Sequence, residues 1–235
     1  MGYFSYLYYY NWSYLVFMLP LIILTLIVQG VMKSTFNKYG SIRNSRNLTG
    51  AQAAERVLMS RGVTGVRIER VSGQYTDHFD PRTNVIRLSD TVYDNPSIAA
   101  VGVACHEAGH AVQHAEGYLP NKIRSAILPV ANIGSKLSWI LIILGLATSM
   151  FQPLLYVGII LFSASVLFTL ATLPVEFNAS SRALKCIKET GMLSDSEYPG
   201  AKKTLQAAAM TYVASAAVSV AQLLRLILIA QNRNR

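Results

Sequence analysis

Four long apolar runs constrain this chain more than any other feature. They cover Ser13–Met32, Leu137–Phe151, Leu154–Leu173 and Leu205–Ala230, and the first three contain no charged residue. About 20 apolar residues are enough for a helix to span a bilayer. Hydrophobic residues make up 52% of the chain and charged residues only 14%, whereas about 25% charged residues is usual in soluble domains. The sequence therefore predicts a mainly α-helical membrane protein with three or four transmembrane helices.

The runs differ in how they are joined. The first is no cleavable signal peptide, because no positive charge precedes it and no small-residue cleavage site follows it. Only Gln152 and Pro153 separate the second and third runs, so we expect a transmembrane hairpin over 137–173. The fourth run is rich in alanine and contains Arg225. Its small residues favour close helix packing, and residues 205–230 fit both a full span and a membrane-packed helix.

Lysine and arginine indicate the orientation of the chain. Thirteen lie from Lys33 to Lys136 and five between Val175 and Thr204, whereas none precedes Ser13. Cytoplasmic loops carry the excess of positive charge in membrane proteins. We therefore expect segments 33–136 and 174–204 to lie in the cytoplasm and the N-terminus outside the cell membrane. The net charge of +9 has the same explanation, and no nucleic-acid partner is expected.

Segment 33–136, which follows the first transmembrane helix at 13–32, has the pattern of an α+β domain. The run LTGAQAAERVLMSRG predicts a helix that Thr49 caps, with Gln52 as its capping-box partner and Gly62 as its end. Val66–Val71 alternates as a strand does, and Asp80–Ser89 predicts a turn followed by a strand.

A second helix is predicted over NPSIAAVGVACHEAGHAVQHAEG. Asn95 would cap it, Pro96 suits its first turn, and Gly117 would end it. This helix carries the motif H-E-x-x-H, as His106, Glu107 and His110. Residues four apart lie on one face of a helix, so both imidazoles can reach one metal. The carboxylate of Glu107 can then take a proton from a metal-bound water. The motif predicts a catalytic Zn²⁺ site.

A catalytic zinc needs a third protein ligand and one open position. His114 lies too far along the helix from His106 to share its metal. Glu116 would need a glycine at position 113, where this chain has glutamine. Glu176, directly after the third run, is the candidate we favour, since zincins with two histidines and a glutamate take the glutamate from a downstream helix. An interfacial charge is the alternative for Glu176. Pro174 is expected to end or kink the span just before it.

The stretch EFNAS at 176–180 resembles the E-F-x-A-D signature of membrane zinc peptidases of the HtpX and CAAX-prenyl-protease type. That resemblance implies a glutamate ligand and an aspartate four residues later, where this chain has Ser180. Asn178 or Ser180 would then supply a weaker hydrogen bond. From Tyr14 to about Leu228 the chain more closely resembles the bacterial YugP-type neutral zinc metallopeptidases, through stretches such as SIAAVGVACHEAGHAVQHAEGY and LPVEFNASSRAL. This resemblance implies a membrane-embedded zincin.

Zincins also have an edge strand to which an extended substrate adds, and Thr76–Phe79 and Asn84–Leu88 are the candidates here. A donor for the oxyanion is expected as well, with His78, Arg182 and Tyr212 as candidates. His78 is more commonly interpreted as a histidine in a surface loop. Arg182 is more commonly interpreted as part of an interfacial ion pair or as a phosphate contact.

The sequence thus predicts a membrane-embedded zinc endopeptidase with a cytoplasmic zincin-like domain. Its substrates would be proteins or peptides, membrane proteins among them, and the lipid bilayer is its other partner. The alternative is a zinc-binding membrane protein for transport, sensing or scaffolding that does not hydrolyse peptides. A transporter would place ionisable ligands inside its spans, and the first three runs offer none. Glu107 also favours hydrolysis, because metal binding alone does not require it.

Overall fold

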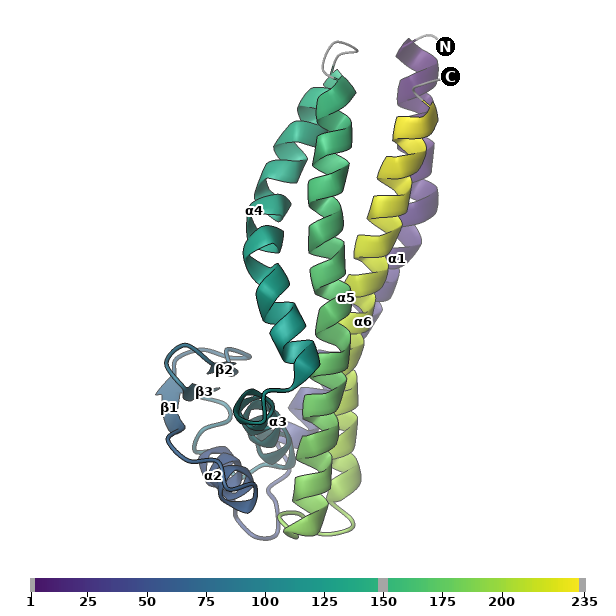
Figure 1. Cartoon of the computed structure of the whole chain (residues 1–235). Coiled ribbons are helices and arrows are strands. Elements are labelled where there is room, and N and C mark those ends of the chain that lie inside the picture. The colour runs from purple at the N-terminus through teal and green to yellow at the C-terminus, as the bar shows by residue number, and fades with distance from the viewer. Residues whose placement is uncertain (1–2, 148–151, 233–235) are drawn as a thin grey trace. The chain divides into compact units, whose positions relative to one another are not determined.

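The computed structural model describes residues 3–147 and 152–232 (Figure 1). The described part is mainly helical with one small sheet, and confirms the predicted fold class. Its elements are α1 (Tyr3–Gly40), α2 (Gly50–Ser60), β1 (Arg67–Val71), β2 (His78–Asp80), β3 (Val85–Ser89), α3 (Ile98–Ala115), α4 (Leu119–Ala147), α5 (Gln152–Glu189) and α6 (Tyr198–Asn232).

The chain divides into two compact units. The helical unit comprises Met1–Val28, Lys122–Leu173 and Tyr212–Arg235, and the polar unit comprises Gln29–Asn121 and Pro174–Thr211. Four helices, α1, α4, α5 and α6, are long and apolar enough to cross a membrane. The described helices therefore include the first, third and fourth apolar runs of the sequence and residues 137–147 of the second.

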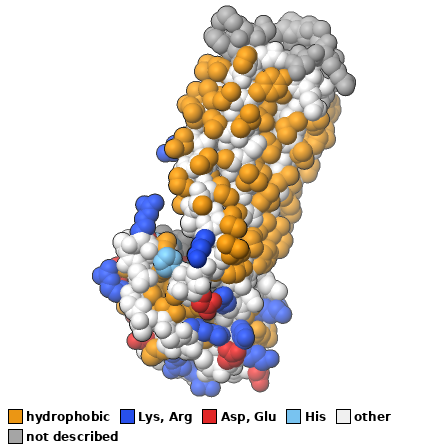
Figure 2. Space-filling model, in the orientation of Figure 1, with side chains coloured by type: hydrophobic (Ala, Val, Ile, Leu, Met, Phe, Trp, Pro, Cys, Tyr) orange, Lys and Arg blue, Asp and Glu red, His pale blue; other side chains and the backbone are white. Residues whose placement is uncertain are grey.

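The surface of the helical unit is apolar. Leu26, Ile143 and Ile160 are 63%, 63% and 70% exposed, and hydrophobic side chains cover the long helices in Figure 2. Inside this unit the helices approach through small residues. A Cβ added to Gly158 of α5 would lie 2.7 Å from the Cγ1 of Ile142 and 3.0 Å from the Ser138 carbonyl oxygen of α4. Such small-residue contacts are typical of helices packed in lipid.

Pro153 and Pro174 both lie within α5. Gln152 and Pro153 are its first residues, where the missing N–H of proline costs nothing because that donor has no helical partner. The turn expected at Gln152 and Pro153 is therefore not at these residues, and residues 148–151 lie outside the described part of the chain. Pro174 does not end the helix either, since α5 continues to Glu189.

Helix α2 forms as its sequence predicts. Thr49 is the N-cap, its hydroxyl accepts from the Gln52 amide, and the Gln52 side chain accepts from the Thr49 amide at 3.1 Å. Gly62 follows the helix with a φ of +64°, a conformation that glycine adopts without steric cost. Both predicted ends of this helix are confirmed.

Helix α3 begins two residues later than predicted. Its cap is Ser97, whose Oγ accepts from the Ala100 amide at 3.2 Å. The predicted cap, Asn95, instead donates its side-chain amide to the Thr91 carbonyl oxygen. Asparagine and serine are both good caps, so the residue type alone did not distinguish them. The predicted end is correct, because Gly117 has a φ of +65°.

The sheet has the order β1-β3-β2, with β3 parallel to β1 and antiparallel to β2. Strand β3 is therefore central and paired on both sides, so the prediction that Asn84–Leu88 is an edge for substrate was wrong. The physical reason is burial, since Val85, Ile86 and Leu88 are fully buried, and strands buried on both faces have continuous rather than alternating apolar residues. The other candidate, Thr76–Phe79, overlaps strand β2 at His78 and Phe79. Strand β2 does lie at an edge of the sheet.

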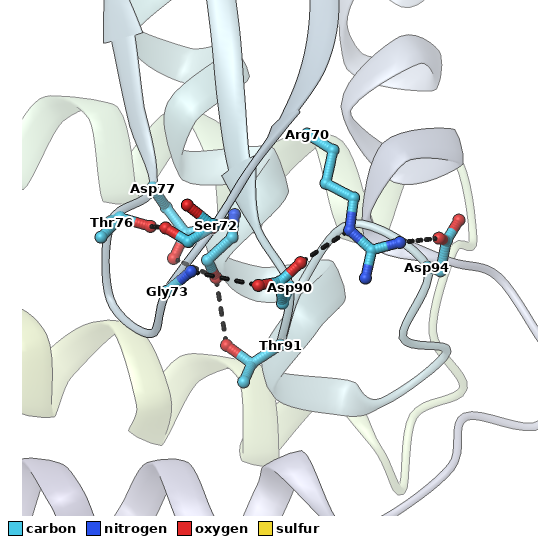
Figure 3. A network of polar contacts seen from close by, with 9 residues as sticks. Arg70, Ser72, Gly73, Thr76, Asp77, Asp90, Thr91 and Asp94 are labelled. Atoms are coloured by element: carbon cyan, nitrogen blue, oxygen red, sulfur yellow. Dashed lines mark hydrogen bonds and ion pairs between the residues drawn. The ribbon is translucent and has the colours of Figure 1, made fainter.

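A polar network fixes the turn before β2 (Figure 3). The Asp77 carboxylate accepts from the Ser89 amide at 2.7 Å and from the Ser89 hydroxyl at 3.0 Å. Arg70 pairs with Asp90 and Asp94, and Asp90 also accepts from the Gly73 amide. Burial raises the pKa of Asp77, although the Ser89 hydrogen bonds oppose it. The turn is thus tied to the end of β3 and the start of the β3–α3 connection.

The core of the polar unit joins segments distant in sequence. Helix α3 contacts α2, β2 and β3. The part of α5 after Pro174 and the start of α6 complete the buried cluster. Fully buried members include Ala53, Ile86, Ala104 and Ile187. This core brings α3, which carries H-E-x-x-H, against the part of α5 that follows Pro174.

Candidate metal centre

Three side chains from two helices converge in the polar unit. His106 and His110 come from α3 and Glu176 comes from α5. The Nε2 atoms of the two histidines are 3.2 Å apart. The Oε2 atom of Glu176 lies 3.2 Å from the Nε2 of His106 and 3.5 Å from that of His110. The structure therefore brings together the three residues that the sequence predicts as metal ligands.

The spacing of these three atoms fits zinc. Zinc binds nitrogen at about 2.0–2.1 Å and carboxylate oxygen at about 2.0–2.2 Å in tetrahedral sites. Ligand atoms at those radii and the tetrahedral angle are about 3.3 Å apart. The three separations of 3.2, 3.2 and 3.5 Å match three vertices of such a tetrahedron. Two imidazoles and one carboxylate are also the ligand types that zinc takes in hydrolytic sites.

Gly109, inside the motif, permits the approach of α5. A Cβ added to Gly109 would lie 2.9 Å from the carbonyl oxygen of Ala179, closer than side-chain carbons approach backbone oxygens. Ala179 is fully buried and is three residues beyond Glu176. Glycine at 109 therefore lets α3 and α5 come close enough for the Glu176 carboxylate to reach both histidines.

The centre is mostly buried. The side chain of Glu176 is 5% exposed, and those of His106 and His110 are 14% and 15% exposed. Burial lowers the pKa of His110, but its hydrogen bond to Glu176 and the charges of Glu107 and Glu176 raise it, and the net pKa lies above the ordinary value. The negative charge that favours a proton here also favours a cation.

Glu107 follows His106 on α3 and is 8% exposed. It is not one of the three converging residues. A buried carboxylate beside a metal site, without being a ligand, is the usual arrangement for a base that acts on a bound water. The structure is consistent with the separate role that the sequence predicts for this residue.

Each histidine also has a partner on its other ring nitrogen. The Nδ1 of His106 lies 3.1 Å from the Ser180 hydroxyl, and the Nδ1 of His110 lies 3.0 Å from the Oε1 of Gln113. The contact of Ser180 agrees with its predicted hydrogen-bonding role. That of Gln113 was not predicted, although a side chain three residues after a ligand lies on the same helix face, and this spacing could have revealed it.

The remaining candidates have other partners. Asn178 accepts from Arg182 at 2.7 Å, and Arg182 forms an ion pair with Glu116. Arg182 thus forms an ion pair, which was one interpretation of this residue. His78 is exposed on β2, with its Nδ1 2.8 Å from the Thr76 carbonyl oxygen.

His114, set aside as a ligand, is exposed and packs its ring against Phe79 with 5.7 Å between centroids. Glu116, likewise set aside, forms the pair with Arg182 described above. Tyr212, the third oxyanion candidate, belongs to the helical unit. The structure thus keeps both rejected ligands out of the three-residue cluster.

Comparison with known proteins gives a consistent result. A family described as "Putative neutral zinc metallopeptidase" matches residues 14–231. The chain is also 47% identical over 201 residues to the "Putative membrane protease YugP" of Bacillus subtilis (strain 168), covering 86% of this chain and 89% of that protein. No solved structure matches the chain.

The match to the family extends over nearly the whole chain, including all four long helices and the candidate metal centre. Zn²⁺ is the cofactor that this family implies, and the ligand types and spacing fit it. With its four membrane-length helices, the chain is a membrane protein that belongs to the neutral zinc metallopeptidase family.

Proposed function

We propose that this protein is a membrane-embedded zinc endopeptidase in which His106, His110 and Glu176 hold the metal and Glu107 is the general base. The observation that carries the proposal is the convergence of two imidazole nitrogens and one carboxylate oxygen within 3.5 Å of one another. Two histidines and a glutamate, with a second glutamate between the histidines, make this a gluzincin-like site.

Zinc in such a site supplies a lowered pKa for its bound water and polarises the carbonyl to be cleaved. The task of Glu107 is proton transfer. Its carboxylate accepts the proton of the attacking water and then delivers it to the leaving amine nitrogen, so that the amine leaves neutral. Burial of Glu107 keeps this proton away from bulk water between the two steps.

Strand β2 is the proposed binding edge for an extended substrate. It pairs with β3 on one side, and among the described residues no strand pairs with its other side. It also contacts α3, which carries the two histidines. Main-chain hydrogen bonds from an edge strand bind peptides with little dependence on sequence. Protein and peptide substrates, including membrane proteins near the bilayer, fit this arrangement.

We further propose that the N-terminus lies outside the cell membrane and the polar unit in the cytoplasm. The positive-inside rule supports this orientation, because eighteen of the 21 lysines and arginines lie in segments 33–136 and 175–204. Labelling in intact cells tests it with Asp80→Cys, since the native Cys105 and Cys186 are buried. A membrane-impermeant reagent should label this variant only after the cells are opened. Labelling from outside would overturn the orientation.

The decisive experiment compares zinc content with cleavage of an unfolded protein such as casein. Glu107→Gln should keep its zinc and lose at least about 10²-fold in rate, the usual contribution of a general base. Glu176→Ala should lose both zinc and activity. Glu55→Gln is the matched control, since it makes the same replacement at an exposed glutamate of α2 and should change neither.

Three results would contradict this proposal. Full zinc content in Glu176→Ala would exclude that residue as a ligand. Undiminished cleavage by Glu107→Gln would exclude the base, and a wild type that binds zinc but cleaves nothing would favour the alternative of a non-proteolytic zinc-binding membrane protein.

A further inference from the structure

Imidazole can bind zinc through one ring nitrogen only if its proton sits on the other. In this centre the Nε2 atoms of His106 and His110 face the Glu176 carboxylate, so both Nδ1 atoms must carry a proton when zinc is bound. A hydrogen-bond acceptor at Nδ1 fixes the proton there. The two histidines have different acceptors at this position, and the difference is informative.

The acceptor of His110 has a fixed direction. Gln113 is fully buried, and its Oε1 lies 3.0 Å from the Nδ1 of His110. Its Nε2 donates to the Val175 carbonyl oxygen at 2.9 Å. A backbone carbonyl can only accept, so the NH₂ end of the amide must face Val175 and the oxygen end must face His110.

Asn178 reinforces that direction. The Nε2 of Gln113 also donates to the Oδ1 of Asn178 at 2.9 Å, and the same oxygen accepts from the Nε of Arg182 at 2.7 Å. A guanidinium can only donate, so Asn178 must turn its oxygen toward both partners. Arg182 is itself held by the Glu116 carboxylate at 2.6 Å.

The acceptor of His106 has no such constraint. Ser180 lies 3.1 Å from its Nδ1, and a hydroxyl can either donate or accept. It therefore tolerates both tautomers of His106. The two histidines of the motif thus differ in how strongly the protein selects the tautomer that zinc requires.

We propose that Gln113 is the positioning residue of the metal centre, holding His110 in its Nδ1–H tautomer so that Nε2 is free for zinc. Asn178 and Arg182 keep the amide of Gln113 in the required direction. The proposal rests on His110 as a zinc ligand in the proposed function, and it assigns Arg182 to the support of the site rather than to substrate.

Zinc affinity, measured by competition with a chelator of known affinity, is the first test. Gln113→Leu should bind zinc about 10–100-fold more weakly, the usual effect of losing such a partner. Gln206→Leu makes the same replacement at an exposed glutamine of the polar unit and should leave affinity unchanged. Arg182→Met alters a partly exposed side chain, so it preserves the core, and it should weaken zinc binding by a smaller factor.

NMR of zinc-loaded protein with ¹⁵N-labelled histidine separates this role from a purely structural one. Wild type should show a slowly exchanging proton bonded to the Nδ1 of His110. That proton should exchange faster in Arg182→Met and lose its protection in Gln113→Leu, while the overall spectrum is kept.

Unchanged zinc affinity and unchanged exchange of this proton in both variants would overturn the role of Gln113 and leave the proposed function intact. If His110→Ala binds zinc as tightly as wild type, the proposed metal centre itself fails. The two failures are therefore distinguishable.

Discussion

The two units of this protein differ most plainly in where their acidic residues lie. All 12 aspartates and glutamates fall within the residues of the polar unit, and the helical unit contains none. The helical unit instead exposes large aliphatic side chains such as Ile160, whereas the polar unit has a large buried apolar core and surface ion pairs such as those of Arg70. The comparison indicates that each unit is built for a different solvent, lipid for one and water for the other.

The prediction with the largest expected effect introduces one lysine into each unit. Ile160 of α5 and Met59 of α2 are similarly exposed, at 70% and 65%. Ile160→Lys should cost about 2.5–3.5 kcal/mol, the insertion cost of a lysine at the centre of a membrane helix. Met59→Lys should stay within about 0.5 kcal/mol of wild type, as surface substitutions in water do.

Unfolding of the protein in bilayers gives both values, and Ile160→Leu is the conservative control. If Ile160→Lys were as mild as Met59→Lys, the apolar surface of the helical unit would face water and the comparison would fail.

The second test concerns the close contact behind the metal centre. Gly109→Ala should destabilise the polar unit by about 1–3 kcal/mol, the usual cost of overpacking, because the new methyl meets the rigid backbone oxygen of Ala179. It should also weaken zinc binding at least tenfold by moving Glu176 from the histidines.

Gly102 of the same helix is the matched control for this test. There a Cβ would meet its nearest atom, the Cβ of Ala201, at 3.5 Å, an ordinary contact. Gly102→Ala should therefore bind zinc like wild type in the same chelator competition. Equal zinc affinities in the two variants would remove the role of the Gly109 contact.

A third test addresses the packing of the helical unit. Gly158→Ala would bring its methyl close to Ile142 and to the Ser138 carbonyl oxygen. Because Ile142 is buried and two backbone atoms lie 3.0 Å from the added carbon, we expect a loss of about 1–3 kcal/mol, the usual cost of overpacking. Unfolding in mixed micelles measures it, and zinc affinity should not change. Gly30→Ala, where nothing lies within 4 Å, should be neutral or slightly stabilising.

The smallest expected effect is the response to acid. Hydrogen bonds from Thr83 and from the Arg82 amide, and then from Arg87, lower the pKa of Asp80 to about 2 from 3.8. Its contribution to stability is therefore complete above about pH 4 and is lost as the pH falls through about 2. The pKa of Asp77 is raised by burial, so the contribution of Asp77 to stability decreases as the pH rises.

Hydrogen exchange between pH 5 and pH 2 should show the loss around β2 and the turn before β3. Asp80→Asn should flatten this dependence, and α4, which has no acidic residue, should show none. Equal acid sensitivity in α4 and β2 would mean that the Asp80 contacts do not cause it.

Local signals predicted much of this fold. The Thr49 capping box, Gly62 and Gly117 mark helix ends through contacts within a few residues, so the sequence nearby is sufficient. The errors arose where a choice depended on distant partners. Ser97 rather than Asn95 caps α3, and Asn44 and Arg43 contact the chain at Pro96 and Ser97. The central position of β3 likewise depends on its pairing with β1, which no local pattern reveals.

The residues of the candidate site also fall into those that local spacing predicts and those that depend on distant partners. His106, Glu107 and His110 follow from spacing on one helix, and Glu176 followed from its position after a span and from family resemblance. The spacing of Gln113 from His110 could have indicated their contact, since the two lie three residues apart on one helix. The direction of the Gln113 amide, in contrast, depends on Val175 and Asn178, more than 60 residues away, and no local pattern reveals it.

The contact at Gly109 also has an evolutionary consequence. Glycine and alanine codons differ by a single base, so mutation offers alanine at this position repeatedly. Because the Ala179 carbonyl oxygen leaves no room for the extra carbon, selection should remove that change from every lineage that still needs the metal. The position of Gly102, which has that room, should drift freely between small residues. Sequence variation at these two glycines would then separate lineages that retain the metal centre from those that have abandoned it.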